Sequence, residues 1–250
     1  MDRNKLAKAV TRAGVLLIEN GAEVTRVEDT MYRICKAYNA STIDSYATPT
    51  LLIISFSFDD DNQIYHNIKR VYMKDINLEK IDQVNTLSRR IVNEHLSLEE
   101  FDNELKKIDN QKGYDTLIEC IGAAICCFGF GLFFNGRTLD VLCAMVIGVM
   151  VKLLLILFER LNFGSFIRYL LSGAILALLS IISASILSSD RDIVIISTIM
   201  LLVPGLTITN AIRDSINGDV ISGLVRGTEA IFIAVAIAVG TGLVFSLIGG

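Results

Sequence analysis

Apolar residues recur at helical spacing near the start of the chain. Leu6, Val10, Ala13 and Leu17 follow one another at steps of three or four, which places them on one face of a helix. Gly21 follows at a position where a glycine commonly ends a helix. The same spacing predicts further helices over residues 24–38, 78–91 and 97–108, and the last of these opens with the capping-box pattern of Ser97 and Glu100.

Between the second and third of these helices the pattern changes to β-branched and aromatic residues. Three such stretches are STIDSYATPT, LLIISFSF and QIYHNIKRVYM, at residues 41–50, 51–58 and 63–73. Pro49 separates the first two, and the turn residues Asp59 to Asn62 separate the last two. This arrangement predicts three strands. Together with the helices, the strands predict a small α+β domain.

The rest of the chain contains five long apolar runs, each long enough to cross a lipid bilayer. We therefore expect a membrane protein, in which a cytoplasmic α+β domain at residues 1–112 precedes an all-α bundle of about five transmembrane helices at residues 113–250. The runs are Leu117 to Phe134, Leu139 to Phe158, Phe166 to Leu187, Ile193 to Asn210, and Val220 or Ala230 to Ile248.

Charge follows the same division. Of the first 112 residues 34 are charged, against 16 of the remaining 138. The near balance of acidic and basic residues in the first part argues against a nucleic-acid groove. The N-terminus is too charged for a cleaved signal peptide, so we expect the first part to remain in the cytoplasm. An odd number of spans then puts the C-terminus outside a cell membrane, and the arginines at 160, 168, 213 and 226 against those at 137 and 191 agree with the positive-inside rule.

Metal, cofactor and catalytic motifs are not evident. Four of the five cysteines lie inside apolar runs without a CxxC pair, which indicates small apolar packing rather than a metal site or a disulfide framework. His66 and His95 lack a catalytic partner at a recognisable spacing. The sequence also lacks a P-loop, so direct use of ATP is not expected. We expect no catalytic residue and no cofactor.

The fourth apolar run contains polar residues at membrane depth. Pro204 would lie about 16 Å into a layer about 30 Å thick, where it removes a helix hydrogen bond. Gly205 loosens the backbone, and Thr207 and Asn210 supply polar groups beyond the break. These features are typical of a substrate site in a broken helix. The alternative is an ordinary proline kink that neighbouring helices satisfy.

The residues after this run predict an amphipathic connector near the membrane boundary. For a small carboxylate-bearing solute, Arg213 or Arg226 could form a bidentate contact. Asp214 or Glu229 could receive an amino group or a proton. The candidate solute-site residues are Pro204, Gly205, Thr207, Asn210, Arg213, Asp214, Asn217, Asp219, Arg226 and Glu229.

Two further groups of charges permit two interpretations each. Lys152 either extends along its own stem to the membrane surface or has a role in transport, and Glu119 lies only one turn inside the first run. In GAEVTRVEDT, the spacing of Glu23 with Arg26 and of Asp29 with Arg33 is that of surface ion pairs, and the alternative is a catalytic or docking role.

The segments GAEVTRVEDTMYRICKAY, ATPT and LVPGLTITNAIRDSINGDVISGLVRGTEA resemble the threonine/serine exporter (ThrE-like) family over nearly the whole chain. This resemblance implies a cytoplasmic domain, about five spans, and export of threonine and serine or of a dicarboxylate such as succinate. The chain stops before a second block of spans, so it resembles the larger subunit of the split type, which works with a small membrane-embedded partner. We expect such an oligomer in the lipid bilayer. In the first domain the matching residues are Gly21, Glu23, Arg26, Glu28 and Asp29.

An alternative function is that residues 1–112 form an enzyme or a regulatory domain on a membrane anchor. The clustered charges from Glu23 to Arg33 motivate this alternative. A nucleophile and base pair that would support catalysis is not evident in the sequence.

Overall fold

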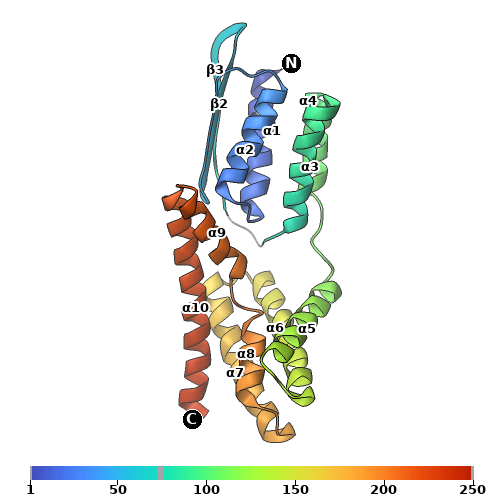
Figure 1. Cartoon of the computed structure of the whole chain (residues 1–250), viewed down its shortest axis with the longest axis vertical. Helices are drawn as coiled ribbons and strands as arrows, with labels where there is room; N and C mark the ends of the chain where they lie inside the picture. The colour runs from blue at the N-terminus through green and yellow to red at the C-terminus, as the bar shows by residue number, and fades with distance from the viewer. Residues whose placement is uncertain (1, 73–75, 249–250) are drawn as a thin grey trace. The chain divides into compact units, whose positions relative to one another are not determined.

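A computed structural model describes residues 2–72 and 76–248 of the chain (Figure 1). The strands are β1 (Ile43–Ala47), β2 (Leu51–Phe58) and β3 (Asp61–Arg70). The helices are α1 (Arg3–Glu19), α2 (Val24–Ala37), α3 (Leu78–Glu94), α4 (Leu98–Asp109), α5 (Thr116–Phe133), α6 (Thr138–Arg160), α7 (Ser165–Leu187), α8 (Arg191–Ile199), α9 (Gly205–Ile216) and α10 (Val220–Ile248).

The chain forms two compact units. The N-terminal unit contains Met1–Gly113 and Leu206–Gly227, and the apolar unit contains Tyr114–Gly205 and Thr228–Gly250. Residues 206–227, here called the connector, comprise most of α9 and the first turns of α10, and they pack with the N-terminal unit. The predicted division into domains at residues 112 and 113 stays a prediction.

In the N-terminal unit, α1 and α2 lie between the sheet and the pair α3 and α4 (Figure 1). The described strands form an antiparallel sheet in the order β1-β2-β3. Alternate residues of β2 are buried, as expected for a strand with one face on a core. The inward side chains are Leu52, Ile54, Phe56 and Phe58.

The predicted helices and strands of this unit are confirmed. The capping box that opens α4 forms as expected, because the Ser97 hydroxyl accepts from the Glu100 N–H and the Glu100 carboxylate accepts from the Ser97 N–H. The predicted third strand reaches Met73, which lies outside the described residues.

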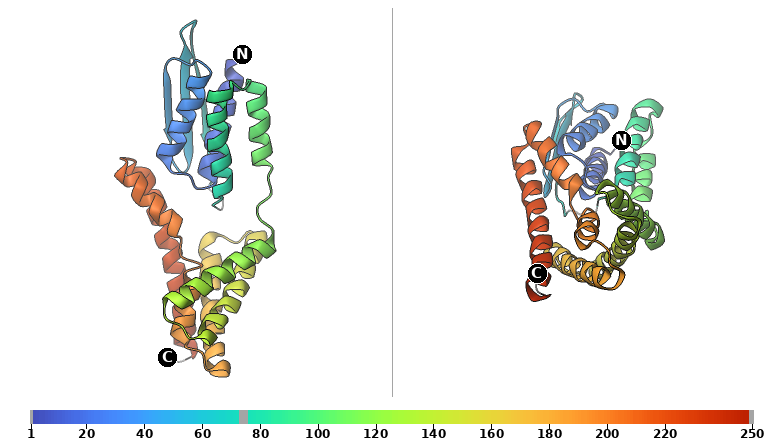
Figure 2. Two further views of the ribbon diagram at one scale, coloured as in Figure 1. Left: turned by 45° about the vertical axis from the view of Figure 1, so that its right-hand side comes forward. Right: turned by 60° about the horizontal axis from the view of Figure 1, so that its bottom comes forward.

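In the apolar unit, α6 packs against α5, α7 and α8 (Figure 2). Glycines allow close helix contact here: a Cβ added at Gly240 of α10 would lie 2.1 Å from the Leu170 carbonyl oxygen of α7. Four helices within the described part, α5, α6, α7 and α10, are long and apolar enough to cross a membrane. These helices support a membrane protein.

The fourth of the five predicted runs does not form one helix. Helix α8 ends at Ile199, residues 200–204 lie outside both helices, and α9 begins at Gly205. Pro204 therefore immediately precedes a helix, where its missing N–H removes no helix hydrogen bond. The expected break is present, but as a separation of two helices rather than a kink within one. The bundle of five continuous spans is not confirmed.

Candidate functional site

The polar face of α9 lies against the turn that joins α1 to α2. Asn210 and Asp214 lie four residues apart on one side of α9, and Asn217 follows directly after the helix ends at Ile216. Gly21 adopts a φ of +91°, a conformation that favours glycine, and reverses the chain between the two N-terminal helices. We call residues 21–25 the corner. Each of the following contacts joins the corner to the connector.

Asp214 binds the first turn of α2. Its Oδ1 accepts a hydrogen bond from the Val24 N–H at 3.1 Å, and Glu23, the residue that precedes α2, makes no side-chain cap of its own. The first N–H groups of a helix lack intrahelical partners and carry a partial positive charge. A carboxylate from a distant part of the chain therefore supplies the cap that the local sequence lacks.

Arg226 is the ionic partner of Asp214. Its Nε lies 3.2 Å from Asp214 Oδ2, and the two side chains are 1% and 0% exposed. Its Nη2 donates to the Ala22 carbonyl oxygen at 2.6 Å. Because an unpaired buried charge is costly, each of these two residues requires the other.

Three further side chains complete the contact. Asn210 Nδ2 donates to the Gly21 carbonyl oxygen at 2.8 Å. Arg213 forms an ion pair with Glu23, and Asn217 Nδ2 donates to Thr25 Oγ1 at 3.2 Å. Side-chain donors thus meet the carbonyl groups that follow α1, while an acceptor meets the first N–H of α2. The Asp214 acceptor matches the partial positive charge at the start of α2.

Burial changes the pKa values of two carboxyl groups, those of Asp214 and Glu28. Burial raises the pKa of the Asp214 carboxyl, while the Arg226 guanidinium and the Val24 N–H act in the opposite direction. Burial also raises the pKa of Glu28, whose Oε1 accepts from the Ala47 N–H at 2.8 Å. Glu28 therefore links α2 to the end of β1.

Helices α9 and α10 approach closely within the connector. A Cβ at Gly223 would lie 2.7 Å from the Ala211 carbonyl oxygen, and Gly218 turns the chain with a φ of +98°. Asp219 directly precedes α10, and its carbonyl oxygen accepts from the Gly223 N–H. These glycines allow Asp214 and Arg226 to meet from consecutive helices.

The remaining predicted residues lie apart from this contact. Pro204 directly precedes α9, Gly205 and Thr207 lie in its first turn, and Glu229 lies in α10 beyond the connector. Lys152 forms an ion pair with Glu119 at 3.2 Å, which joins α6 to α5. On α2, Arg26 is exposed, and Asp29 pairs with Arg33 at 2.8 Å as a surface pair. Glu23 was expected to pair with Arg26 and pairs instead with Arg213.

One buried acid escaped the sequence interpretation. Asp140 at the start of α6 is 0% exposed, pairs with Arg137, and accepts from the Asp190 N–H at 2.6 Å. It therefore ties the start of α6 to the residue that precedes α8. The three-residue spacing of Arg137 and Asp140 was a local signal for the first of these contacts.

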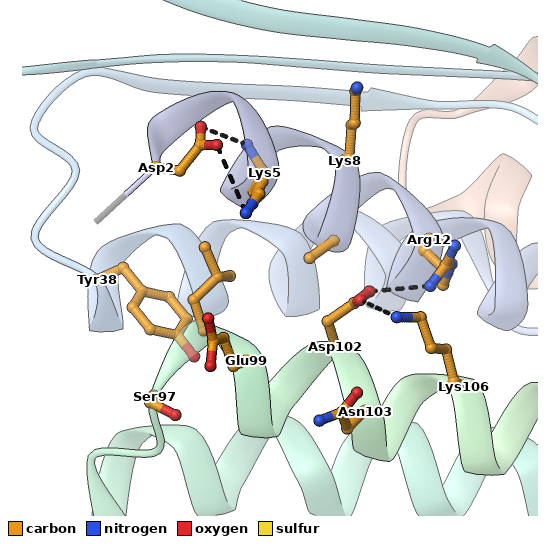
Figure 3. A pocket seen from close by; sticks show the side chains of 12 residues that line it. Asp2, Lys5, Lys8, Arg12, Tyr38, Ser97, Glu99, Asp102, Asn103 and Lys106 are labelled. Carbon is orange, nitrogen blue, oxygen red and sulfur yellow. Dashed lines mark hydrogen bonds and ion pairs between the residues drawn. The ribbon is translucent and has the colours of Figure 1, made fainter.

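A cleft of about 880 Å³ opens on the N-terminal unit between α1 and α4 (Figure 3). Asp102 lies between Arg12 and Lys106 and pairs with both, at 2.9 and 2.6 Å. The Tyr38 hydroxyl donates to the Leu96 carbonyl oxygen, and burial raises the pKa of Tyr38 to about 12. The cleft thus presents largely paired charges of both signs.

Comparison with known proteins places the chain. A family model described as "Putative threonine/serine exporter" matches residues 8–248. The chain belongs to this ThrE family. The chain is 20% identical over 237 residues to a curated protein of Mycobacterium tuberculosis (strain ATCC 25618 / H37Rv), "Probable threonine/serine exporter".

That similarity covers 94% of this chain and 45% of the relative. The chain therefore spans less than half the length of the curated ThrE relative that it matches. No solved structure matches the chain. The corner and the connector lie within the segment that the family model matches.

Proposed function

We propose that this ThrE family member is a membrane transporter subunit that exports a small carboxylate-bearing metabolite from the cytoplasm. Threonine and serine are the first candidates, because the family model and the curated relative carry those names. A dicarboxylate such as succinate is the alternative substrate. We further propose that the chain works with a small membrane-embedded partner polypeptide.

The observation that carries this proposal is the interruption between α8 and α9. A helix break within an apolar segment brings backbone groups and polar side chains to a place where they require polar partners. Pro204 and Gly205 form the second side of this break, and Thr207 follows within the first turn of α9. We propose that the solute contacts this region, with Glu229 and Lys152 as further polar groups of the pathway.

The two arginines of the connector, Arg213 and Arg226, already bind other residues of the chain. Arg226 is committed to Asp214 and Ala22, and Arg213 to Glu23. The alternative, a direct contact of either guanidinium with a carboxylate solute, requires these ion pairs to open. In the conformation described here they position the connector.

Reconstituted efflux tests the proposal. The chain is purified from native membranes together with its associated small polypeptide, and vesicles are loaded with labelled threonine, serine or succinate. We expect release of at least one solute, and about a tenfold loss of rate in Thr207→Val, the effect of losing about one hydrogen bond. Ser185→Ala removes an exposed hydroxyl of α7 and is the matched control. Absence of release of all three solutes, from vesicles that contain both polypeptides, would contradict the proposal.

The cleft between α1 and α4 favours a second candidate function for residues 1–112. Its size suits a small charged ligand, and it is lined by Lys5, Lys8, Arg12 and Lys106 as well as by acidic residues. In this case the N-terminal unit would regulate transport by binding such a ligand. Titration of the full chain with inorganic phosphate or succinate should then raise its unfolding temperature, and Lys8→Ala should remove the effect.

A further inference from the structure

Helix α10 is one continuous helix that belongs to both compact units. It runs without interruption from Val220 to Ile248, and the assignment changes between Gly227 and Thr228. At the other end of the connector, α9 begins directly after the break at residues 200–204. A helix resists bending over short lengths, so displacement of the first turns of α10 is transmitted along the helix.

Hydrogen bonds and ion pairs hold the connector to the corner. Two of its contacts involve fully buried charges, because Asp214 caps α2 while Arg226 binds both Asp214 and Ala22. Separation of the corner from the connector would remove the Val24 N–H from its acceptor and leave Arg226 without the Ala22 carbonyl. The penalty for such unsatisfied groups makes the corner and the connector move together.

Stability alone is a weak reason for a buried ion pair. Replacing such a pair by apolar residues is often neutral or stabilising, so its presence points to a requirement for one particular arrangement. In the connector that arrangement fixes the first turns of α10 against the corner.

We propose that the connector is a coupling element, in which Glu23, Arg213, Asp214 and Arg226 are positioning residues that transmit movement of the N-terminal unit to α10 and to the break before α9. These residues act on transport without contact with the solute. The inference rests on the proposed function for its transport readout, and it has a second readout that does not.

Charge reversal at the outer ion pair tests the coupling. The side chains of Glu23 and Arg213 are 21% and 58% exposed, so reversal does not place a charge in a dry core. We expect Glu23→Arg and Arg213→Glu each to lower the maximum rate of efflux about tenfold, within the usual range of coupling free energies. The half-saturation concentration for the solute should stay unchanged, because neither residue contacts the solute.

The double variant Glu23→Arg/Arg213→Glu restores the pair with opposite polarity. We expect it to recover most of the maximum rate. If Arg213 instead binds the solute carboxylate, the double variant stays inactive and Arg213→Glu raises the half-saturation concentration. That result, or single variants as active as the wild type, would overturn the coupling proposal.

Hydrogen exchange provides the readout that does not depend on transport. The Val24 N–H is bound to Asp214, so its exchange reports whether the connector is seated on the corner. We expect the peptide containing Val24 to exchange faster in each single variant and to regain protection in the double variant.

The matched control reverses the surface pair Arg90 and Glu94 of α3, with expected rates and exchange equal to wild type. If no solute is transported but the Val24 peptide exchanges faster in the single variants and is protected again in the double variant, the proposed function is contradicted. The contact between the connector and the corner is then still supported. Unchanged exchange in the single variants would contradict the seating itself.

Discussion

Asp214 of α9 accepts a hydrogen bond from the backbone N–H of Val24, a residue 190 positions earlier in the chain, and so caps helix α2 from outside. This contact assigns a structural task to a residue that the sequence suggested as a solute ligand. It also makes the connector part of the N-terminal unit. The following predictions test the contact, the packing of the apolar unit and the anchoring of the sheet.

Removal of Arg226 should destabilise the N-terminal unit strongly. Arg226→Met leaves Asp214 buried without its counter-ion, and loss of one partner of a buried pair costs about 3–5 kcal/mol. The double variant Asp214→Asn/Arg226→Met should lose less than the sum of the single variants, because no isolated charge remains. Thermal unfolding in detergent measures these changes. The exposed Arg90→Met should lower stability by less than about 1 kcal/mol, and a similarly small effect of Arg226→Met would refute the interpretation.

Gly240 should be intolerant of a methyl group. Its Cβ would lie 2.1 Å from the Leu170 carbonyl oxygen, a backbone atom that cannot rotate away, so α7 and α10 would have to separate. We expect Gly240→Ala to cost about 1–3 kcal/mol, as overpacking generally does. Gly242→Ala is the matched control on the same helix, since no other part of the described chain lies within 4 Å of its Cβ. Equal unfolding temperatures for the two variants would show that the helices do not cross in this way.

The contact between α1 and the β2–β3 turn should weaken in acid. The Tyr65 hydroxyl and then Arg3 hold the pKa of Asp61 below its usual value, which is about 3.9. Asp61 is therefore ionised in the folded chain at a pH where the unfolded chain is partly protonated. Its contribution is fully present above the usual value and is lost as the pH falls through the lowered folded value.

The measurement is the unfolding temperature of the full chain between about pH 6 and about pH 2. The wild type should lose more stability over this range than Asp61→Asn, which has no proton to gain at this position. Parallel curves for the two proteins would show that the ionised Asp61 does not stabilise the fold through its pair with Arg3.

Local patterns predicted the elements well, because spacing and caps act within a few residues. The helix over residues 24–38, the capping box at Ser97 and the break near Pro204 all follow from neighbours in the sequence. The partners of the charged side chains did not follow. Glu23 has Arg26 at the spacing of a surface pair, yet it pairs with Arg213, since a contact across 190 residues leaves no local pattern.

The candidate site was therefore predicted in its residues but not in its arrangement. Both GAEVTR and the stretch from Asn210 to Arg226 were singled out, as two separate features. Gly21 marked the end of the first helix, but neither the course of the chain after it nor the close approach of α9 and α10 follows from composition or periodicity.

Chemical cross-linking in native membranes tests most directly whether the connector is seated on the corner. Thr25 and Asn217 are both exposed, and their side chains are joined by a hydrogen bond of 3.2 Å. In the full chain carrying Thr25→Cys and Asn217→Cys, a short bifunctional thiol reagent should link the two positions within one molecule. The account predicts efficient linkage, and little linkage when Asn217→Cys is combined instead with Asp44→Cys on β1. Failure of the first pair to link, while both thiols react freely with a monofunctional reagent, would contradict the account.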